Sequence, residues 1–331
     1  MFMAISRTPY RISFFGGGTD YPDWYLKHEG AVLSMAIDKY CYITGRHMPP
    51  FFGIRHRIVW SHIETVGAIS EILHPAVRAG LKATGFDDEE GVELHHQGDL
   101  PARSGIGSSS AFAVGLINAL HAMRGETISR DDLARAAIDL ERNHLQEMVG
   151  SQDQVASAHG GLNVIQFRRN GAIDVEPIGL SDDVRREFER RLMVFYTGTS
   201  RLSTSMAQQF IENLAAKEGN LKKMQAMVPE AVALLKRGDF DAFGKMLHDT
   251  WMLKRSLTPS ISTGVIDRIY DDASRAGALG GKLLGAGGSG FMVFVVPPEK
   301  HRAVQEALSH LISVPVRTDF TGSTIIYRQD E

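Results

Sequence analysis

Residues 100–112 read Leu-Pro-Ala-Arg-Ser-Gly-Ile-Gly-Ser-Ser-Ser-Ala-Phe, a glycine- and serine-rich loop that runs into an apolar helical pattern. Such a junction directs several backbone N–H groups and the positive end of a helix toward one point, which suits an anionic phosphate. Gly105, Gly107 and Ser108 are small enough for the backbone to approach the anion closely. Ser109 and Ser110 add hydroxyl ligands for a phosphate or for Mg²⁺. An ordinary serine N-cap is the alternative, but three serines after Gly-x-Gly exceed what a cap requires.

Composition restricts the class of protein. The 331 residues are enough for two domains of about 150 each, and 43% hydrophobic with 23% charged residues is typical of a globular protein. A net charge of −3 gives no basic surface for nucleic acid or an anionic membrane. The single cysteine, Cys41, excludes an internal disulfide. With no signal-peptide pattern and no apolar run of roughly 18 residues, we expect a cytoplasmic enzyme that acts on small molecules.

Strand and helix patterns occur in separate groups along the chain, which predicts an α+β fold with a boundary near residue 186. The pattern predicts strands at 10–15, 57–60, 91–96, 162–167, 173–178, 192–196, 291–296 and 324–328. It predicts helices from 108 to about 123, from Ser129 to Gly150, over much of 203–276, and over 298–312.

Two further glycine-rich blocks flank the serine loop in the sequence. In residues 8–22, Arg11 lies within an apolar strand and Asp20 follows three consecutive glycines. The block at 280–291 contains Gly-x-Gly-x-x-Gly, which is a dinucleotide-binding pattern. That pattern requires a following helix, but a strand follows here, so we reject a Rossmann site. The chain also lacks the P-loop pattern and the protein-kinase motifs.

An acidic pair, Glu141 and Asp153, lies on either side of the end of the helix predicted to stop at Gly150. The two carboxylates are close enough in sequence to face one site. A solvated helical glutamate and a turn aspartate are the alternative interpretation, and the sequence pattern leaves both open.

These blocks, in this order, resemble the GHMP kinases. The family signature Pro-x-x-x-Gly-Leu-Gly-Ser-Ser-x-Ala matches residues 101–111 with Ile106 in place of leucine. The signature Gly-Ala-Gly-x-Gly-Gly matches residues 285–290 with Ser289 in place of glycine. The resemblance implies a two-domain GHMP kinase fold, in which residues 1–185 form a ribosomal protein S5-like ATP-binding domain and residues 186–331 form a ferredoxin-like domain.

The resemblance also implies roles for individual residues. Asp153 would be catalytic and would pair with Arg11, while Ser109 and Glu141 would bind Mg²⁺. The nucleotide phosphates would be bound by Gly105, Ile106, Gly107, Ser108, Ser109 and Ser110. The sugar would be bound by Thr19, Asp20, Arg201, Gly285, Gly287 and Gly288.

Within the family the chain is most similar to bacterial D-glycero-D-manno-heptose 7-phosphate kinases. This implies transfer of the γ-phosphoryl of MgATP to the anomeric hydroxyl of that sugar, giving a 1,7-bisphosphate for GDP-heptose biosynthesis. A fucose- or galactose-type 1-kinase acting on an unphosphorylated hexose is one alternative, and a non-catalytic sensor of sugar and ATP is another. The partners implied are a sugar phosphate and ATP, with no nucleic acid or membrane, and a homodimer is left open. The candidates for binding a distal phosphate are Arg46, Arg55, Arg57, Arg201, Lys254 and Arg255.

Overall fold

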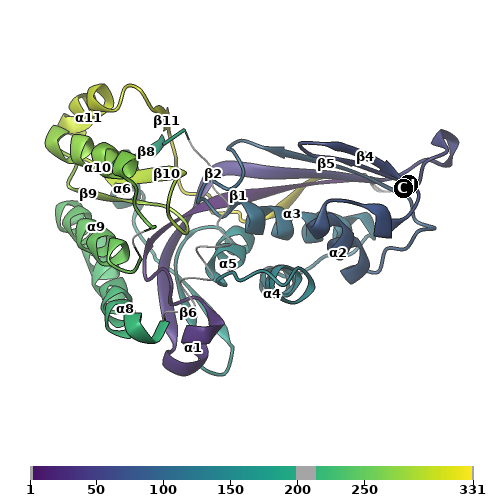
Figure 1. Cartoon of the computed structure of the whole chain (residues 1–331), viewed down its shortest axis with the longest axis horizontal. Helices are drawn as coiled ribbons and strands as arrows, with labels where there is room; N and C mark the ends of the chain where they lie inside the picture. Colours follow the sequence, from purple (N-terminus) through teal and green to yellow (C-terminus); the bar gives the residue numbers. More distant parts are fainter. Residues whose placement is uncertain (1–2, 199–213, 259, 330–331) are drawn as a thin grey trace.

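The computed structural model describes residues 3–198, 214–258 and 260–329, and it contains two sheets, each with its own helices (Figure 1). The larger sheet has the strand order β12-β1-β2-β5-β3-β4, with β6 paired to β2 and β7 paired to β6. Its strands are β1 (Met3–Phe15), β2 (Gly30–His47), β3 (His56–Val59), β4 (Ile63–Val66), β5 (Val92–Gly98), β6 (Leu162–Phe167), β7 (Ile173–Pro177) and β12 (Thr324–Gln329).

Helices cover one face of this sheet, and α3 (Ser108–Met123) packs directly on β1 and β2 (Figure 1). Most of α3 is buried, as expected for a helix that is apolar on nearly all sides. The other helical segments of this unit are α1 (Pro22–His28), η1 (Pro50–Phe52), η2 (Ile69–Glu71), α2 (Pro75–Ala83), α4 (Arg130–Asp139), η3 (Leu140–His144) and α5 (Gln152–His159).

The smaller sheet has the strand order β11-β8-β10-β9, and every pairing in it is antiparallel. Its strands are β8 (Leu192–Tyr196), β9 (Gly280–Leu283), β10 (Phe291–Val295) and β11 (Ile312–Val314). Its helical segments are α6 (Asp182–Arg190), α8 (Leu214–Arg237), α9 (Phe240–Arg255), α10 (Gly264–Ala276), η4 (Pro298–Lys300) and α11 (His301–Ala307). The α+β prediction is therefore confirmed.

An aromatic cluster joins the two units. Phe14 and Phe15, at the end of β1, contact Phe243 of α9 with ring centroids 5.6 and 5.2 Å apart. Phe188 of α6 packs against both Phe14 and Phe243. All four rings are fully buried. Burial of each aromatic side chain contributes roughly 1.5–3 kcal/mol, so this cluster holds the end of β1 firmly against the second unit.

The helix predicted from Ser129 to Gly150 ends earlier than expected. It is α-helical only to Asp139, continues as the π-helical turn η3, and gives way to irregular chain in which Gln146 has a φ of 55°. A π-helical turn often marks a functional site because it redirects a side chain. Here the turn contains Glu141, whose buried carboxylate is bound by side chains of two other helices.

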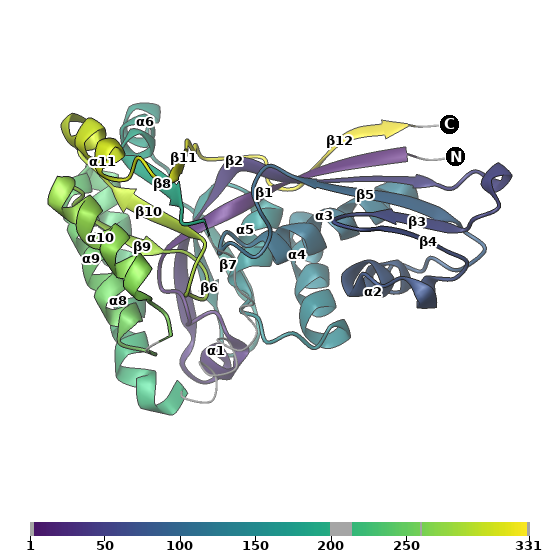
Figure 2. The same ribbon diagram turned by 45° about the horizontal axis from the view of Figure 1, so that its top comes forward.

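The end of the chain also differs from the linear prediction. Residues 298–312 form only short helical segments before β11, because Ile312 begins a strand that pairs with β8. The predicted last strand is present as β12, but it returns to the first unit and pairs with β1 (Figure 2). A single boundary near residue 186 therefore does not describe the larger sheet. In the described parts of the chain, no helix has both the length and the hydropathy needed to span a membrane.

Candidate active site

The N-terminus of α3 forms the centre of the candidate site. Gly107 is its N-cap residue and has a φ of 73°, a conformation that glycine adopts without strain. A side chain at this position would lie 3.3 Å from the Arg11 Cγ atom and from an Asp153 carboxylate oxygen. Glycine therefore allows the positive end of α3 to lie directly beside these two residues.

Arg11 and Asp153 form a bidentate ion pair. The Nε and Nη2 atoms of Arg11, on β1, each donate to an Asp153 carboxylate oxygen at 2.7 Å. Its Nη1 atom donates to the Gly105 carbonyl at 2.6 Å, so the guanidinium also holds the serine loop. Arg11 is buried, whereas the Asp153 side chain is 24% exposed at the start of α5. The carboxylate is therefore both held in place and accessible to a ligand.

Asp20 lies beside this pair in the turn after β1. Its carboxylate accepts hydrogen bonds from the backbone N–H groups of Gly18 at 3.0 Å and Gln152 at 3.4 Å. Burial, followed by the negative charge of Asp153, raises the pKa of Asp20 to about 6. Thr19 is fully buried, and its hydroxyl donates to the Gly16 carbonyl. Thr19 thus stabilises the turn that presents Asp20.

Replacing Asp20 with asparagine is expected to raise the free energy of unfolding relative to that of the wild type as the pH rises. The pKa of the Asp20 carboxyl is about 6 in the folded chain and near 3.8 in the unfolded chain. The folded state therefore binds more protons between these values, and the free energy of unfolding of the wild type falls as pH rises through this interval. An asparagine does not titrate, so the difference in stability should shift in favour of Asp20→Asn by on the order of 2 kcal/mol.

Urea unfolding at pH 3.5 and pH 7 measures this difference. Asp183→Asn is the matched control, because the Asp183 side chain is almost fully exposed on α6. A stability difference between Asp20→Asn and wild type that stays constant over this range would contradict the elevated pKa of Asp20.

Glu141 forms a second acidic position against the first turn of α3. Its Oε2 atom accepts a hydrogen bond from the Ser110 hydroxyl at 2.7 Å and another from the Gln154 side-chain amide. Its Oε1 atom is buried without a hydrogen-bond partner among the described residues. Burial raises the pKa of Glu141 to about 7, although the Ser110 and Gln154 hydrogen bonds oppose this shift. The unpaired carboxylate oxygen is suited to a cation.

Of the neighbouring serines at the start of α3, Ser109 was expected to bind Mg²⁺ together with Glu141. Ser110 is the serine that contacts this carboxylate, while Ser109 is exposed on the first turn of α3. Neighbouring residues on a helix project about 100° apart, so only one of the two can face η3. Ser108 is used differently again, since its hydroxyl accepts a hydrogen bond from the Arg103 N–H at 2.9 Å.

The glycine loop between β9 and β10 packs against the serine loop. A Cβ atom on Gly105 would overlap the Leu284 carbonyl, and the Phe291 N–H donates to the Ser104 carbonyl at 3.0 Å. Gly285 therefore lies at the serine loop. The other two glycines predicted to bind sugar, Gly287 and Gly288, lie against Ile261. Ser289 is accommodated because its backbone does not have a positive φ.

Two lysines of the second unit lie next to this loop. Lys254, in the last turn of α9, donates to the carbonyls of Leu283 at 3.1 Å and Gly285 at 2.5 Å. Lys282, on β9, is buried and donates to the Phe14 carbonyl at 2.9 Å. The sequence had identified Lys254 only as one of several phosphate-binding candidates, and it had missed Lys282. The position of Lys282 within the glycine-rich block at 280–291 was the signal that could have identified it.

The other phosphate-binding candidates have carboxylate partners. Arg46 and Arg57 pair with Glu93, Arg55 pairs with Glu89, and Arg255 pairs with Asp267. Arg201 lies outside the described residues.

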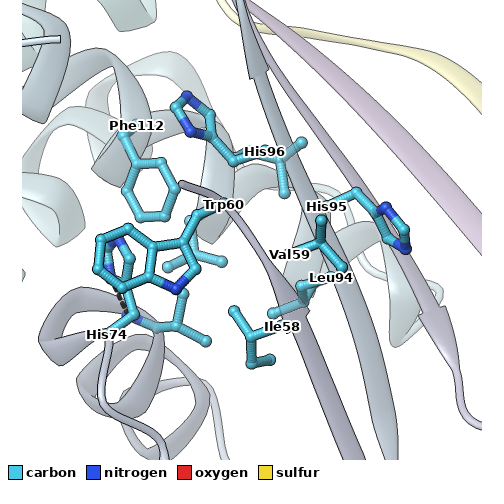
Figure 3. Close-up of a pocket in the computed structure, with 11 residues that line it drawn as sticks. Ile58, Val59, Trp60, His74, Leu94, His95, His96 and Phe112 are labelled. Atoms are coloured by element: carbon cyan, nitrogen blue, oxygen red, sulfur yellow. Dashed lines mark hydrogen bonds between the residues drawn. The ribbon is translucent and has the colours of Figure 1, made fainter. Parts of the chain in front are cut away.

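A small apolar pocket that the sequence had not indicated adjoins α3 (Figure 3). Its wall is formed by Trp60 after β3, His74 before α2, His96 on β5, and Phe112 on α3 (Figure 3). Phe112 lies close to the first turn of α3, so the pocket is a short distance from the serine loop. Inside the pocket His74 stacks on Phe112 and contacts Trp60 edge to face, so the rings pack against one another.

The donor set at Glu141 bears on metal binding. Among residues 3–198, 214–258 and 260–329, no cluster of three or more histidine, cysteine, aspartate or glutamate side chains is arranged to hold a metal ion. Sparse protein ligation is what Mg²⁺ favours, because it retains water and takes phosphate oxygens as ligands. The free Glu141 oxygen and the neighbouring serine hydroxyl fit that pattern.

Comparison with known proteins identifies relatives of this chain. Residues 70–161 match the GHMP kinases N-terminal domain and residues 231–314 match the GHMP kinases C-terminal domain. The chain is 28% identical to a D-glycero-alpha-D-manno-heptose 7-phosphate kinase of Campylobacter jejuni over 92% of both chains. It is 25% identical to a galactokinase of Pyrococcus furiosus over 91% of both. A D-glycero-D-manno-heptose 1-phosphate kinase of Bacteroides thetaiotaomicron shares the fold, with a TM-score of 0.79, 22% identity, and coverage of 100% of this chain and 99% of that one. The chain belongs to the GHMP kinase family.

Proposed function

We propose that this protein is a sugar 1-kinase that transfers the γ-phosphoryl of MgATP to the anomeric hydroxyl of D-glycero-D-manno-heptose 7-phosphate. The observation that carries the kinase assignment is the bidentate Arg11–Asp153 pair beside the N-terminus of α3. The similarity to a heptose 7-phosphate kinase over 92% of the chain supports the acceptor. The product would be the 1,7-bisphosphate, a precursor for GDP-heptose.

Each residue of the site has a distinct task in this proposal. The backbone N–H groups at the start of α3 bind the nucleotide phosphates. Asp153 accepts a hydrogen bond from the anomeric hydroxyl and takes its proton as the new O–P bond forms and the bond to ADP breaks. Arg11 holds this carboxylate in a fixed orientation through two hydrogen bonds. Asp20 binds a hydroxyl of the sugar, with Thr19 holding its turn.

Mg²⁺ would be held by Glu141 and the serine hydroxyls at the start of α3, namely Ser110 and Ser109. When bound, it would neutralise charge on the nucleotide phosphates. The buried and unpaired Oε1 atom of Glu141 supports this assignment.

We further propose that the adenine base of ATP stacks on Trp60 at the edge of the pocket, because Trp60 is only half-buried and the pocket itself is too small to enclose a base. Trp60→Ala is then expected to raise the KM for ATP by about fivefold to 100-fold, since stacking on an aromatic side chain contributes about 1–3 kcal/mol per base. The kcat should change little, because Trp60 does not contact the reacting atoms. Steady-state kinetics with varied ATP measures the effect, with Phe51→Ala as control because Phe51 is 88% exposed. An unchanged KM for ATP would place the base elsewhere.

The acceptor is tested by Mg²⁺-dependent release of ADP from ATP. D-glycero-D-manno-heptose 7-phosphate, mannose, fucose and galactose would be compared side by side. Turnover confined to the heptose 7-phosphate is the expected result. Turnover on a free hexose would retain the kinase and overturn the acceptor, as the similarity to a galactokinase allows. Binding of ATP and sugar without release of ADP would instead indicate a sensor.

A further inference from the structure

Lys254 and Lys282 place two amino groups near the Arg11–Asp153 pair, and the mechanism above does not use them. Lys254 is partly exposed and Lys282 is buried. The charge of Arg11 affects both lysines, lowering the pKa of each, although burial is the larger cause. Lys254 acts on Lys282 in the same way. The three cations therefore form one electrostatic group.

The partners of these two lysines are unusual for basic side chains that are buried or partly buried. Both ammonium groups donate to backbone carbonyls, and within the described ranges neither lies within ion-pair distance of a carboxylate. By contrast, the described arginines that the sequence offered as phosphate ligands all have acidic partners. Lys254 uses two of its three N–H donors on the Leu283 and Gly285 carbonyls, so one remains for a ligand.

With both lysines protonated, the charges at this point of the site do not balance. Arg11, Lys254 and Lys282 would then carry three positive charges against one negative charge on Asp153, and burial lowers the pKa of Lys254 to about 7 and that of Lys282 well below its usual value. The remaining acid, Asp20, has a pKa raised to about 6, and its charge favours protonated Lys282 less strongly than burial disfavours it. Buried charge without a counter-charge is costly, and such an arrangement is retained where a ligand supplies the missing charge. A phosphoryl group is an anion of the required sign and size.

We propose that Lys254 and Lys282 form a phosphoryl-binding pair at the glycine loop. Lys254 contacts the phosphoryl oxygens directly, and Lys282 is a positioning residue that adds positive charge behind the β9 end of the loop. The phosphoryl group comes either from the acceptor or from the γ position of the nucleotide. If the phosphoryl group belongs to the acceptor, the inference rests on the proposed function. If it is the γ-phosphoryl group of the nucleotide, the inference requires only that the protein is a kinase.

Calorimetric titration of Lys254→Met with matched ligands tests this pair. The ligands are D-glycero-D-manno-heptose 7-phosphate against the unphosphorylated heptose, and ATP against ADP. We expect Lys254→Met to weaken binding of the phosphorylated member of one couple by about 10- to 100-fold, as for loss of a hydrogen bond between charged groups. The other member of that couple should bind Lys254→Met with the same affinity as it binds the wild type. Lys282→Met should show the same selectivity, and Lys254→Arg should restore part of the affinity.

The outcomes separate the two sources. Selective weakening of heptose 7-phosphate binding would show that the lysine pair binds the phosphate of the acceptor. Selective weakening of ATP binding would show that it binds the transferred group. Lys245→Met is the control, since Lys245 is exposed on the same helix. Wild-type affinity of Lys254→Met for all four ligands would overturn the proposal. An equal loss for all four that Lys254→Arg does not reverse would also overturn it, because that result indicates a structural role.

Inorganic phosphate provides a test that is independent of the acceptor. It should raise the Tm of the wild type and of Lys254→Arg more than that of Lys254→Met. Equal shifts in all three proteins would count against the pair. A wild type that binds neither heptose would refute the proposed acceptor alone, since the nucleotide and phosphate measurements would still decide the role of the lysines.

Discussion

Replacing Asp153 with asparagine is expected to lower kcat by about 10²- to 10⁴-fold, the usual contribution of a group that takes a proton in the transition state. The amide is a much weaker proton acceptor than the carboxylate. One of its two polar groups must also face the Arg11 guanidinium as a donor, which disrupts the bidentate pair. ATP should still bind, because α3 and the serine loop remain. Release of ADP measures the loss of kcat, and calorimetry measures the retained affinity for ATP.

Asp174→Asn provides a matched control for the loss of an ion pair. Asp174 pairs with the Arg168 Nε atom at 2.7 Å, the same distance as in the site, but its side chain is exposed. This surface pair should contribute little to stability or turnover. If Asp153→Asn turned over at a rate within tenfold of the control, Asp153 would not be the group that activates the acceptor.

Replacing Gly105 with alanine is expected to reduce activity about 100-fold and to destabilise the protein. Gly105 has a φ of 84°, and an added Cβ atom would overlap the Leu284 carbonyl of the opposing glycine loop. Because the atoms that the new Cβ would meet belong to the backbone of the glycine loop, the overlap can be relieved only if the two loops separate. A displacement of about 1 Å at a catalytic centre can cost on the order of 10²-fold in rate. Steady-state kinetics and urea unfolding measure the two effects.

Gly171→Ala separates the cost of the loop contact from the cost of the backbone conformation. Gly171 also has a φ of 84°, but a Cβ atom there would have no neighbour within 4 Å. This control should lose only the roughly 1–2 kcal/mol that a left-handed conformation costs an alanine, and it should keep its activity. Equal effects of the two substitutions would show that the contact between the loops contributes nothing.

Local motifs predicted several parts of the site well. The serine loop and the following helix were recognisable because glycine, serine and apolar periodicity are properties of neighbouring residues, and α3 begins at Ser108 as expected. Arg11 and Asp153 were expected to pair, and they do so although they are 142 positions apart. Here the family resemblance supplied the long-range information. The role of Asp153 in catalysis stays a prediction.

Side-chain direction was harder to predict. Ser109 and Ser110 are equivalent as residue types, and only the position of η3 decides that Ser110 contacts Glu141. The π-helical turn itself has no local sequence signal, since the pattern continues as an ordinary amphipathic helix. The Trp60 pocket and the place of Lys282 were missed for a similar reason. Each depends on several elements that are far apart in sequence.

The sequence alone determined the class of fold and the glycine- and serine-rich loop before α3, because these follow from local composition and spacing. The roles predicted for the main acidic and basic residues came from the family resemblance. The tertiary structure decided how the charges are distributed. Packing of Phe14 and Phe15 against Phe243 brings the second unit to the end of β1. That packing places Lys254 and Lys282 beside Arg11. Electrostatic interactions depend on distance in space, which the order of residues along the chain does not specify.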